Sequence, residues 1–273
     1  MNALSTAAEP AMGSSHGAYN VDSRMPRTER VTSRAIVYRS IDSTNIEAGR
    51  LLQDGTLQLN DDSVVAIAAD MQSAGRGRLD HAWVSRPGES FAVTFVTAVP
   101  RWLALDASVN GWLQMIAGLA AVDGLRGAMR ECGAQSIATV NDDADGAGFM
   151  LKWPNDVFLG GHKLGGILSQ MVSLPVGSMT EGYNDDNKGA DRIAIIFGIG
   201  LNLAIPAEHL PTLQSTSLQL YYAPLPDAES LRDIIAAGIV ESLRARLRGF
   251  AADPHRQAHD LRDEVEKICY TLG

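Results

Sequence analysis

The sequence has little cysteine, no long apolar run and no excess of basic side chains. Its two cysteines, Cys132 and Cys269, are too few and too far apart in sequence for a disulfide framework or a zinc site. It contains no run of about 18 apolar residues, so we expect no transmembrane helix. The 23 basic and 32 acidic side chains give a net charge of −9 at pH 7, which disfavours binding to DNA or to anionic membranes.

The N-terminal segment lacks both the basic region and the continuous apolar region of a secretory signal. Residues 1–33 are rich in Ser, Ala, Gly, Pro and Arg without apolar periodicity, which predicts a disordered leader. This leader is too poor in large apolar residues to form a DNA-reading winged helix. Together with the scarcity of cysteine, these features predict a cytoplasmic protein.

Several common catalytic signatures are also missing. The six histidines show no HExxH or other paired metal spacing, and no GxSxG or Cys/His pattern indicates a nucleophile. Residues 198–202 (GIGLN) lack the third glycine of a dinucleotide-binding motif, because Leu203 occupies that position. An enzyme built from this sequence would therefore bind anions and position substrates, without a covalent intermediate on its own side chain.

Residues 34–273 are expected to form one folded domain. The segments predicted as strands are 36–38, 64–69, 90–98, 157–171 (a hairpin turning at Gly160 and Gly161) and 193–203. The segments predicted as helices follow residues 42–45 and cover 107–130, 227–247 and 254–270. The polar stretches 141–148 and 180–191 predict surface loops. This mixture indicates an α+β fold, with a mixed, mostly antiparallel sheet packed with helices.

A Gly/Arg-rich segment, residues 72–83 (QSAGRGRLDHAW), directly follows a predicted buried strand. Its glycines let the backbone approach a ligand closely, and Arg76 and Arg78 supply forked donors for a carboxylate or a phosphate. The indole of Trp83 is placed to stack on a base. The residues alone leave open a flexible surface loop with solvated arginines.

Two further segments carry candidate groups. Lys152, in residues 151–156 (LKWPND), is either a point charge for a phosphoryl group or a solvated surface lysine. Asp156 fits a metal ligand, a turn former or the partner of a basic residue. Residues 163–168 (KLGGIL) place adjacent glycines in a strand, which predicts either a bulge or the close approach of a ligand.

Taken together, these segments resemble the biotin–protein ligases (biotin–[acetyl-CoA-carboxylase] ligases). The resemblance covers about residues 34–250 and rests on five segments in the family's order: Ser43-Thr44-Asn45, QSAGRGR from Gln72, KWPND from Lys152, KLGGIL from Lys163 and GIGLN from Gly198. It implies that biotin's carboxylate attacks the α-phosphorus of ATP, which gives biotinyl-5′-AMP and pyrophosphate. A lysine of a biotin carboxyl carrier domain then takes the biotin. Both steps develop negative charge at one small centre, which Lys and Arg donors stabilise.

The resemblance also implies cofactors, a partner and residue roles. ATP and Mg²⁺ are implied, with Mg²⁺ arriving on the ATP phosphates and no metal site built from protein ligands alone. The partner is the carrier domain of an acyl-CoA or pyruvate carboxylase, and a homodimer is left open. The residues implied at biotin are Ser43, Thr44, Asn45, Gln72, Gly165 and Gly166. The residues implied at the carboxylate and α-phosphate are Arg76, Gly77, Arg78 and Lys152, with Arg78 and Lys152 catalytic. The residues implied near adenine are Trp83 and Asn202.

The sequence departs from the family pattern at two places. Residues 79–82 (LDHA) replace further Gly and Arg, so the outer part of the loop is less basic. Many members also continue into a small C-terminal β-barrel, whereas this sequence ends near where that barrel would begin. Two alternatives are a lipoate–protein ligase, which shares the fold and the adenylation chemistry, and a non-catalytic biotin sensor. The sequences of residues 72–78 and 152–156 favour a biotin ligase over a lipoate ligase. A biotin sensor that acts as a repressor would need a DNA-reading domain.

Overall fold

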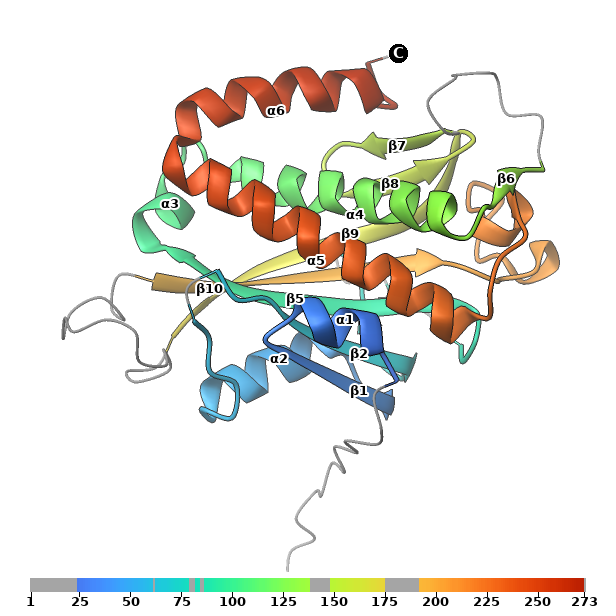
Figure 1. The fold of residues 1–273 in the computed structure, drawn as a ribbon, viewed down its shortest axis with the longest axis horizontal. Coiled ribbons are helices and arrows are strands. Elements are labelled where there is room, and N and C mark those ends of the chain that lie inside the picture. The colour runs from blue at the N-terminus through green and yellow to red at the C-terminus, as the bar shows by residue number, and fades with distance from the viewer. Residues whose placement is uncertain are drawn as a thin grey trace, which may run out of the picture.

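The computed structural model describes residues 24–60, 62–78, 82–83, 86–137, 148–174 and 192–272. Its centre is a seven-stranded sheet with the order β1-β2-β5-β10-β9-β8-β7 (Figure 1). The pair β1 and β2 is parallel, and each other neighbouring pair of this sheet is antiparallel. The predicted mixed, mostly antiparallel sheet is therefore confirmed.

The strands of the central sheet are β1 (Arg34–Ile41), β2 (Val65–Gln72), β5 (Ser90–Pro100), β7 (Phe149–Lys152), β8 (Asp156–Leu159), β9 (His162–Ser173) and β10 (Arg192–Asn202). Two short pairs lie outside it, β3 (Gly75–Arg76) with β4 (Ala82–Trp83) and β6 (Gln135–Ser136) with β11 (Tyr222–Ala223). Strands β5 and β10, of 11 residues each, pair along their whole length, and most of their side chains on both faces are buried.

The helices are α1 (Pro26–Val31), α2 (Thr44–Gln53), α3 (Arg101–Leu105), α4 (Gly111–Glu131), α5 (Ala228–Ala252) and α6 (Pro254–Ile268), with 3₁₀ turns η2 (Ala207–His209) and η3 (Leu218–Leu220). Helices α4 and α5 cross one face of the sheet, and α2 lies on the other face (Figure 1). Asp227 caps the N-terminus of α5, because its carboxylate accepts from the backbone N–H groups of Glu229 and Ser230. No helix of the described residues is both long enough and apolar enough to cross a membrane.

The sheet face beneath α2 changes character along its strands. Side chains alternate between the two faces of a strand, so even-numbered positions of β5 and β10 share this face. At one end Val96 and Ile196 pair in register and belong to the apolar cluster under α2. At the other end Ala92 pairs with Gly200, and these residues carry almost no side chain. The small residues therefore leave a hollow next to a well-packed core.

The N-terminal segment differs from the expected disordered leader. Residues 24–33 are described and include helix α1, and Met25 is fully buried in the main core. The carboxylate of Asp233 on α5 accepts from the backbone N–H groups of Arg27 and Thr28 at 2.9 and 2.8 Å. These contacts come from a helix about 200 residues away, so local sequence gave no sign of them. The prediction is wrong for residues 24–33, and residues 1–23 lie outside the described part of the chain.

Two predicted loops also lie outside the described residues. They are the polar stretches 141–148, of which only Gly148 is described, and 180–191.

Candidate functional site

A cavity of about 580 Å³ opens on the α2 face of the sheet, where the small residues lie. This volume is in the range of small-molecule sites, about 300–1,000 Å³. Its lining residues come from several separate segments: Ser43, Thr44, Asn45, Gln72, Arg76, Gly77, Arg78, Ala82, Trp83, Ala92, Asn155, Asp156, Lys163, Gly165, Gly166, Ile167, Leu168, Gly198, Ile199, Gly200, Asn202, Pro211, Thr212 and Ser215. Every site residue implied by the resemblance is among them except Lys152.

Close contacts at the floor of the cavity require glycine at positions in the GIGLN and KLGGIL segments. A Cβ atom at Gly198 would lie 2.1 Å from Asn45 Oδ1, and one at Gly200 would lie 2.6 Å from Trp83 Cε2. A Cβ at Gly165 would lie 2.1 Å from the Gly200 carbonyl oxygen of the neighbouring strand. Gly198 and Gly200 thus make room for side chains of the site, whereas Gly165 allows β9 to approach β10 closely.

One end of the cavity is a polar cluster at the N-terminus of α2. The backbone N–H of Thr44 donates to Gln72 Oε1 at 2.8 Å, and its hydroxyl donates to the same oxygen at 3.1 Å. Ser43 is the N-cap residue of α2, but its side chain makes no capping bond. Gln72, at the end of β2, therefore satisfies a backbone donor that an ordinary cap would satisfy. This contact ties the Gly/Arg segment to α2.

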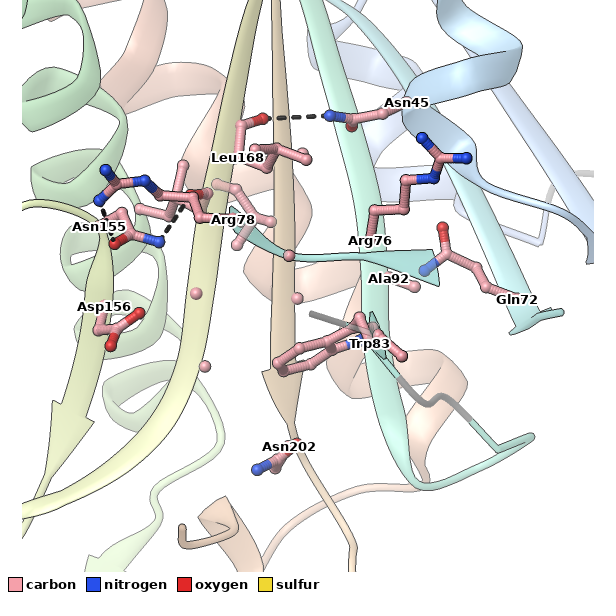
Figure 2. Close-up of a pocket in the computed structure, with 18 of the residues that line it drawn as sticks. Asn45, Gln72, Arg76, Arg78, Trp83, Ala92, Asn155, Asp156, Leu168 and Asn202 are labelled. Atoms are coloured by element: carbon pink, nitrogen blue, oxygen red, sulfur yellow. Dashed lines mark hydrogen bonds between the residues drawn. The ribbon is translucent and has the colours of Figure 1, made fainter. Parts of the chain in front are cut away.

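Asn45 lines this polar end, but its amide is engaged within the protein. Its Nδ2 donates to the Leu168 carbonyl at 3.1 Å (Figure 2), and its Oδ1 accepts from the Thr94 hydroxyl at 2.7 Å. Asn45 is also buried, with 7% of its surface exposed. The side chain thus braces α2 against β5 and β9, and Thr44 presents its oxygen beside it.

An ion-pair cluster holds α2 in place behind the cavity. Arg50 pairs with Asp42, which precedes the helix, and with Glu47 at 3.0 Å. The Arg50 guanidinium holds the pKa of Asp42 below its usual value. The Tyr38 hydroxyl donates to Glu47 at 2.8 Å, and burial together with this carboxylate raises the pKa of Tyr38. Charged Asp42 and neutral Tyr38 are therefore the forms that fix the start of α2.

Basic side chains reach the cavity from two directions. In Figure 2, Arg76 lies on the side of Gln72, whereas Arg78 lies on the opposite side and donates to Asn155 Oδ1 at 3.1 Å. The Asn155 amide nitrogen donates in turn to the Ile167 carbonyl at 3.2 Å. Asn155, which sequence reasoning assigned no role, thus joins the Gly/Arg segment to β9.

Lys152 is not among the residues that line the cavity. Its ammonium lies 5.2 Å from the centre of the Phe158 ring. Lys163 lines the cavity, with Nζ 2.8 Å from Asp156 Oδ1. Because β8 pairs with β9, Asp156 lies opposite Gly166 and Phe158 lies opposite Lys163. Sequence reasoning noticed the KLGGIL segment for its glycines and overlooked the lysine that begins it.

The far end of the cavity is lined by Asn202 and by a loop that sequence reasoning missed, which contributes Pro211, Thr212 and Ser215. The Asn202 amide nitrogen donates to the Thr216 carbonyl at 2.8 Å. Trp83 lies between the two ends (Figure 2), and its buried indole N–H has no partner among the described protein atoms. A buried donor facing a cavity is available to a ligand acceptor.

The described residues do not form a metal site of their own. They contain no group of three or more His, Cys, Asp or Glu side chains placed to hold a metal ion. Asp156 is the carboxylate that lines the cavity, and it is paired with Lys163. Mg²⁺ requires several oxygen ligands, and the Asp156 carboxylate by itself supplies too few of them.

Comparison with known proteins gives one family. The model of the biotin/lipoate A/B protein ligase family matches residues 37–181. The biotin–[acetyl-CoA-carboxylase] ligase of Mycobacterium tuberculosis is 30% identical over 183 residues, which are 67% of this chain and 54% of that protein. The chain spans about half the length of the curated relatives it matches.

Two solved structures show the same fold. The biotin protein ligase from Leishmania major in complex with biotin superposes with a TM-score of 0.56 at 20% identity, covering 88% of this chain and 82% of that chain. The Aquifex aeolicus biotin protein ligase in complex with biotin and ATP gives 0.54 at 22% identity, covering 87% and 79%. The family model covers more than half of the sequence. The chain therefore belongs to the biotin/lipoate A/B protein ligase family.

Proposed function

We propose that this chain is a biotin–protein ligase that activates biotin with ATP to biotinyl-5′-AMP and transfers the biotin to a lysine of a biotin carboxyl carrier domain. The observation that carries this proposal is the division of one cavity into two chemical halves. A hydrogen-bonding end surrounds Thr44 and Gln72, with Arg76 on the same side, and a cationic wall on the opposite side contains Arg78 and Lys163 (Figure 2). A ligand with a polar neutral head and an anionic tail fits this division.

The polar end favours biotin over lipoate. Biotin carries a ureido ring with N–H donors and a carbonyl acceptor, whereas the dithiolane ring of lipoate offers neither. A buried polar site that a ligand leaves unpaired loses binding free energy, about 1–3 kcal/mol for each orphaned group. Thr44, which presents its oxygen to the cavity, would therefore penalise an apolar ligand head. The glycine floor then leaves room for the chain that joins head and carboxylate.

The first reaction forms a bond between the biotin carboxylate oxygen and the α-phosphorus of ATP, and pyrophosphate leaves. Charge accumulates on the α-phosphoryl oxygens as this bond forms. We assign Arg76, Arg78 and Lys163 to these oxygens, since donors aimed at developing charge lower the barrier most. Lys163 here replaces Lys152, because the ammonium of Lys163 borders the cavity. Asp156, at 2.8 Å, orients that ammonium.

In the second reaction a lysine amine of the carrier domain attacks the carbonyl carbon of the adenylate, and AMP leaves with the bonding electron pair. The same cations would stabilise the leaving phosphate, since they already surround it. The unpartnered Trp83 N–H, together with Asn202 and Thr212, would contact the nucleotide. Mg²⁺ would enter with the ATP phosphates. The two cysteines are unpaired, which is consistent with the cytoplasmic location that we propose.

A lipoate–protein ligase is the second candidate, because the matching family model includes lipoate ligases. The two are distinguished by incubating the protein with MgATP, an apo carrier domain of each kind, and equal concentrations of biotin and lipoate. We expect a mass increase of one biotinyl group on the biotin carrier domain and no lipoyl group on either domain. Lipoylation at a comparable rate would reject the biotin assignment, and modification of neither domain would reject both.

A further inference from the structure

Thr94 lies in the middle of β5 and has no exposed surface. None of the five motif segments contains it, and it does not line the cavity. Its hydroxyl oxygen nevertheless lies 2.7 Å from Thr44 Oγ1 and 2.7 Å from Asn45 Oδ1. Thr94 therefore contacts, from beneath, two consecutive residues of the polar end of the cavity, Thr44 and Asn45.

Thr94 lies at the boundary between the cavity and the apolar cluster under α2. On the α2 face it follows Ala92, which lines the cavity, and precedes Val96, which belongs to the apolar cluster. It pairs in register with Gly198, whose missing side chain leaves space for the Asn45 amide. A polar side chain buried at such a boundary is costly without hydrogen-bond partners. The contacts with Thr44 and Asn45 supply the hydrogen-bond partners that the buried Thr94 hydroxyl needs.

The donors and acceptors of the hydrogen bonds around Thr94 show that it supplies a hydrogen-bond donor. The Thr44 hydroxyl donates to Gln72, and the Asn45 amide nitrogen donates to the Leu168 carbonyl. Thr94 has one hydroxyl proton, which the oxygen atoms of Thr44 and Asn45 share in a three-centre hydrogen bond. Among the described contacts, Thr94 is thus the donor to the oxygen atoms of Thr44 and Asn45.

We propose that Thr94 is a positioning residue that sets the hydrogen-bonding polarity of the ligand-head site. Because the Thr44 proton is directed to Gln72, Thr44 presents an oxygen lone pair to the cavity and accepts an N–H group of a cyclic urea. Thr94 fixes the Thr44 side chain in that orientation and keeps the Asn45 carbonyl turned away from Leu168. This inference rests on the proposed function.

Loss of the Thr94 donor has a predictable local effect. The Asn45 oxygen becomes a buried acceptor without its donor, since Asn45 is 7% exposed. A flip of the amide would place its oxygen against the Leu168 carbonyl, which is also an acceptor. Either arrangement disturbs the start of α2, where Thr44 lies. The change affects the ligand head, while the cationic wall around Lys163 stays in place.

The test uses the full chain with three variants. Thr94→Val keeps the shape and removes the donor, and Thr94→Ser keeps the donor. Thr97→Val is the matched control, because Thr97 is a buried threonine on the opposite face of β5 whose hydroxyl donates to the Ser63 carbonyl at 2.7 Å. Calorimetry measures the Kd for biotin, and pyrophosphate exchange measures kcat and the KM for ATP.

We expect Thr94→Val to raise the Kd for biotin about tenfold, which corresponds to about 1.4 kcal/mol. Thr94→Ser and Thr97→Val should stay within about threefold of the unmodified chain, well below the effect of a lost buried donor. The KM for ATP and the kcat at saturating biotin should not change in any variant. If Thr94→Val does not fold, Thr94→Ala should show the same rise in Kd.

Three results would overturn the proposal. They are an unchanged biotin Kd in folded Thr94→Val, a Thr94→Ser variant as weak as Thr94→Val, and an equal loss of biotin affinity in Thr97→Val. If the unmodified chain binds no biotin, the proposed function fails and this inference fails with it. If the unmodified chain binds biotin and Thr94→Val binds it equally well, only the role of Thr94 is rejected.

Discussion

Replacing Lys163 by alanine should slow adenylate formation strongly and affect folding little. The ammonium of Lys163 borders the cavity, so its charge acts where the α-phosphate would develop negative charge. Loss of one such preorganised donor costs about 10²–10³ in rate, or about 2.7–4 kcal/mol of transition-state stabilisation. The ion pair with Asp156 is partly solvated, with the lysine side chain 41% exposed, so it contributes about 0–1 kcal/mol to stability.

Lys152→Ala separates the two lysine assignments. This substitution removes a cation–π contact with Phe158 at 5.2 Å, which contributes about 0.5–1 kcal/mol at an exposed site. We expect a small loss of thermal stability and an unchanged rate of adenylate formation. Lys163→Arg keeps the positive charge but replaces the compact ammonium with a planar guanidinium, so it should retain only part of the rate of adenylate formation.

The assay is a single turnover at saturating biotin and ATP, in which biotinyl-AMP is quantified by mass spectrometry over time. The Kd for biotin is measured separately by calorimetry, since a charge that acts on the transition state changes rate more than ground-state affinity. A normal rate in Lys163→Ala would refute the assignment. A rate in Lys152→Ala as low as that of Lys163→Ala would place Lys152 back among the catalytic candidates.

Arg78→Ala should release biotinyl-AMP faster, because the guanidinium joins the Gly/Arg segment to the opposite side of the cavity; an unchanged dissociation rate would contradict this role. Gly198→Ala should lower stability by about 1–3 kcal/mol and weaken biotin binding. Its new Cβ would lie 2.1 Å from Asn45 Oδ1, and wild-type urea denaturation with normal affinity would disprove the close contact. The pKa of Asp42 is lowered by Arg50, so its contribution to stability is present above its ordinary value of 3.8 and is lost as the pH falls further. Asp42→Asn should therefore flatten the acid side of the stability profile, and an unaltered slope there would count against the ion pair.

The sequence predicted most of the sheet because its strands carry continuous apolar runs. The runs around Val65, Phe95 and Ile196 correspond to β2, β5 and β10, and the glycine pair at Gly160 forms the turn between β8 and β9. Helix α1 was missed because it is stabilised by Asp233 on a distant helix, which local composition does not reveal. The predicted disorder there failed for the same reason.

The candidate site was predicted unevenly. Glycine and arginine signal ligand contact by residue type, so the segments around Arg76 and Gly198 could be identified before the fold was known. The choice between Lys152 and Lys163 depends on how β8 pairs with β9, which a motif does not specify. Thr94 gives no sequence signal at all, because a threonine in an apolar strand is ordinary. Its importance appears only when α2 is packed above it.

A cavity that activates biotin with ATP must support biotin-dependent exchange of labelled pyrophosphate into ATP. The exchange is measured with biotin, with lipoate and with neither, and the bound adenylate is identified by mass spectrometry. We expect exchange with biotin and accumulation of biotinyl-5′-AMP, with only background exchange for lipoate. Absence of biotin-dependent exchange, or lipoyl-AMP at a comparable yield, would contradict the proposed function.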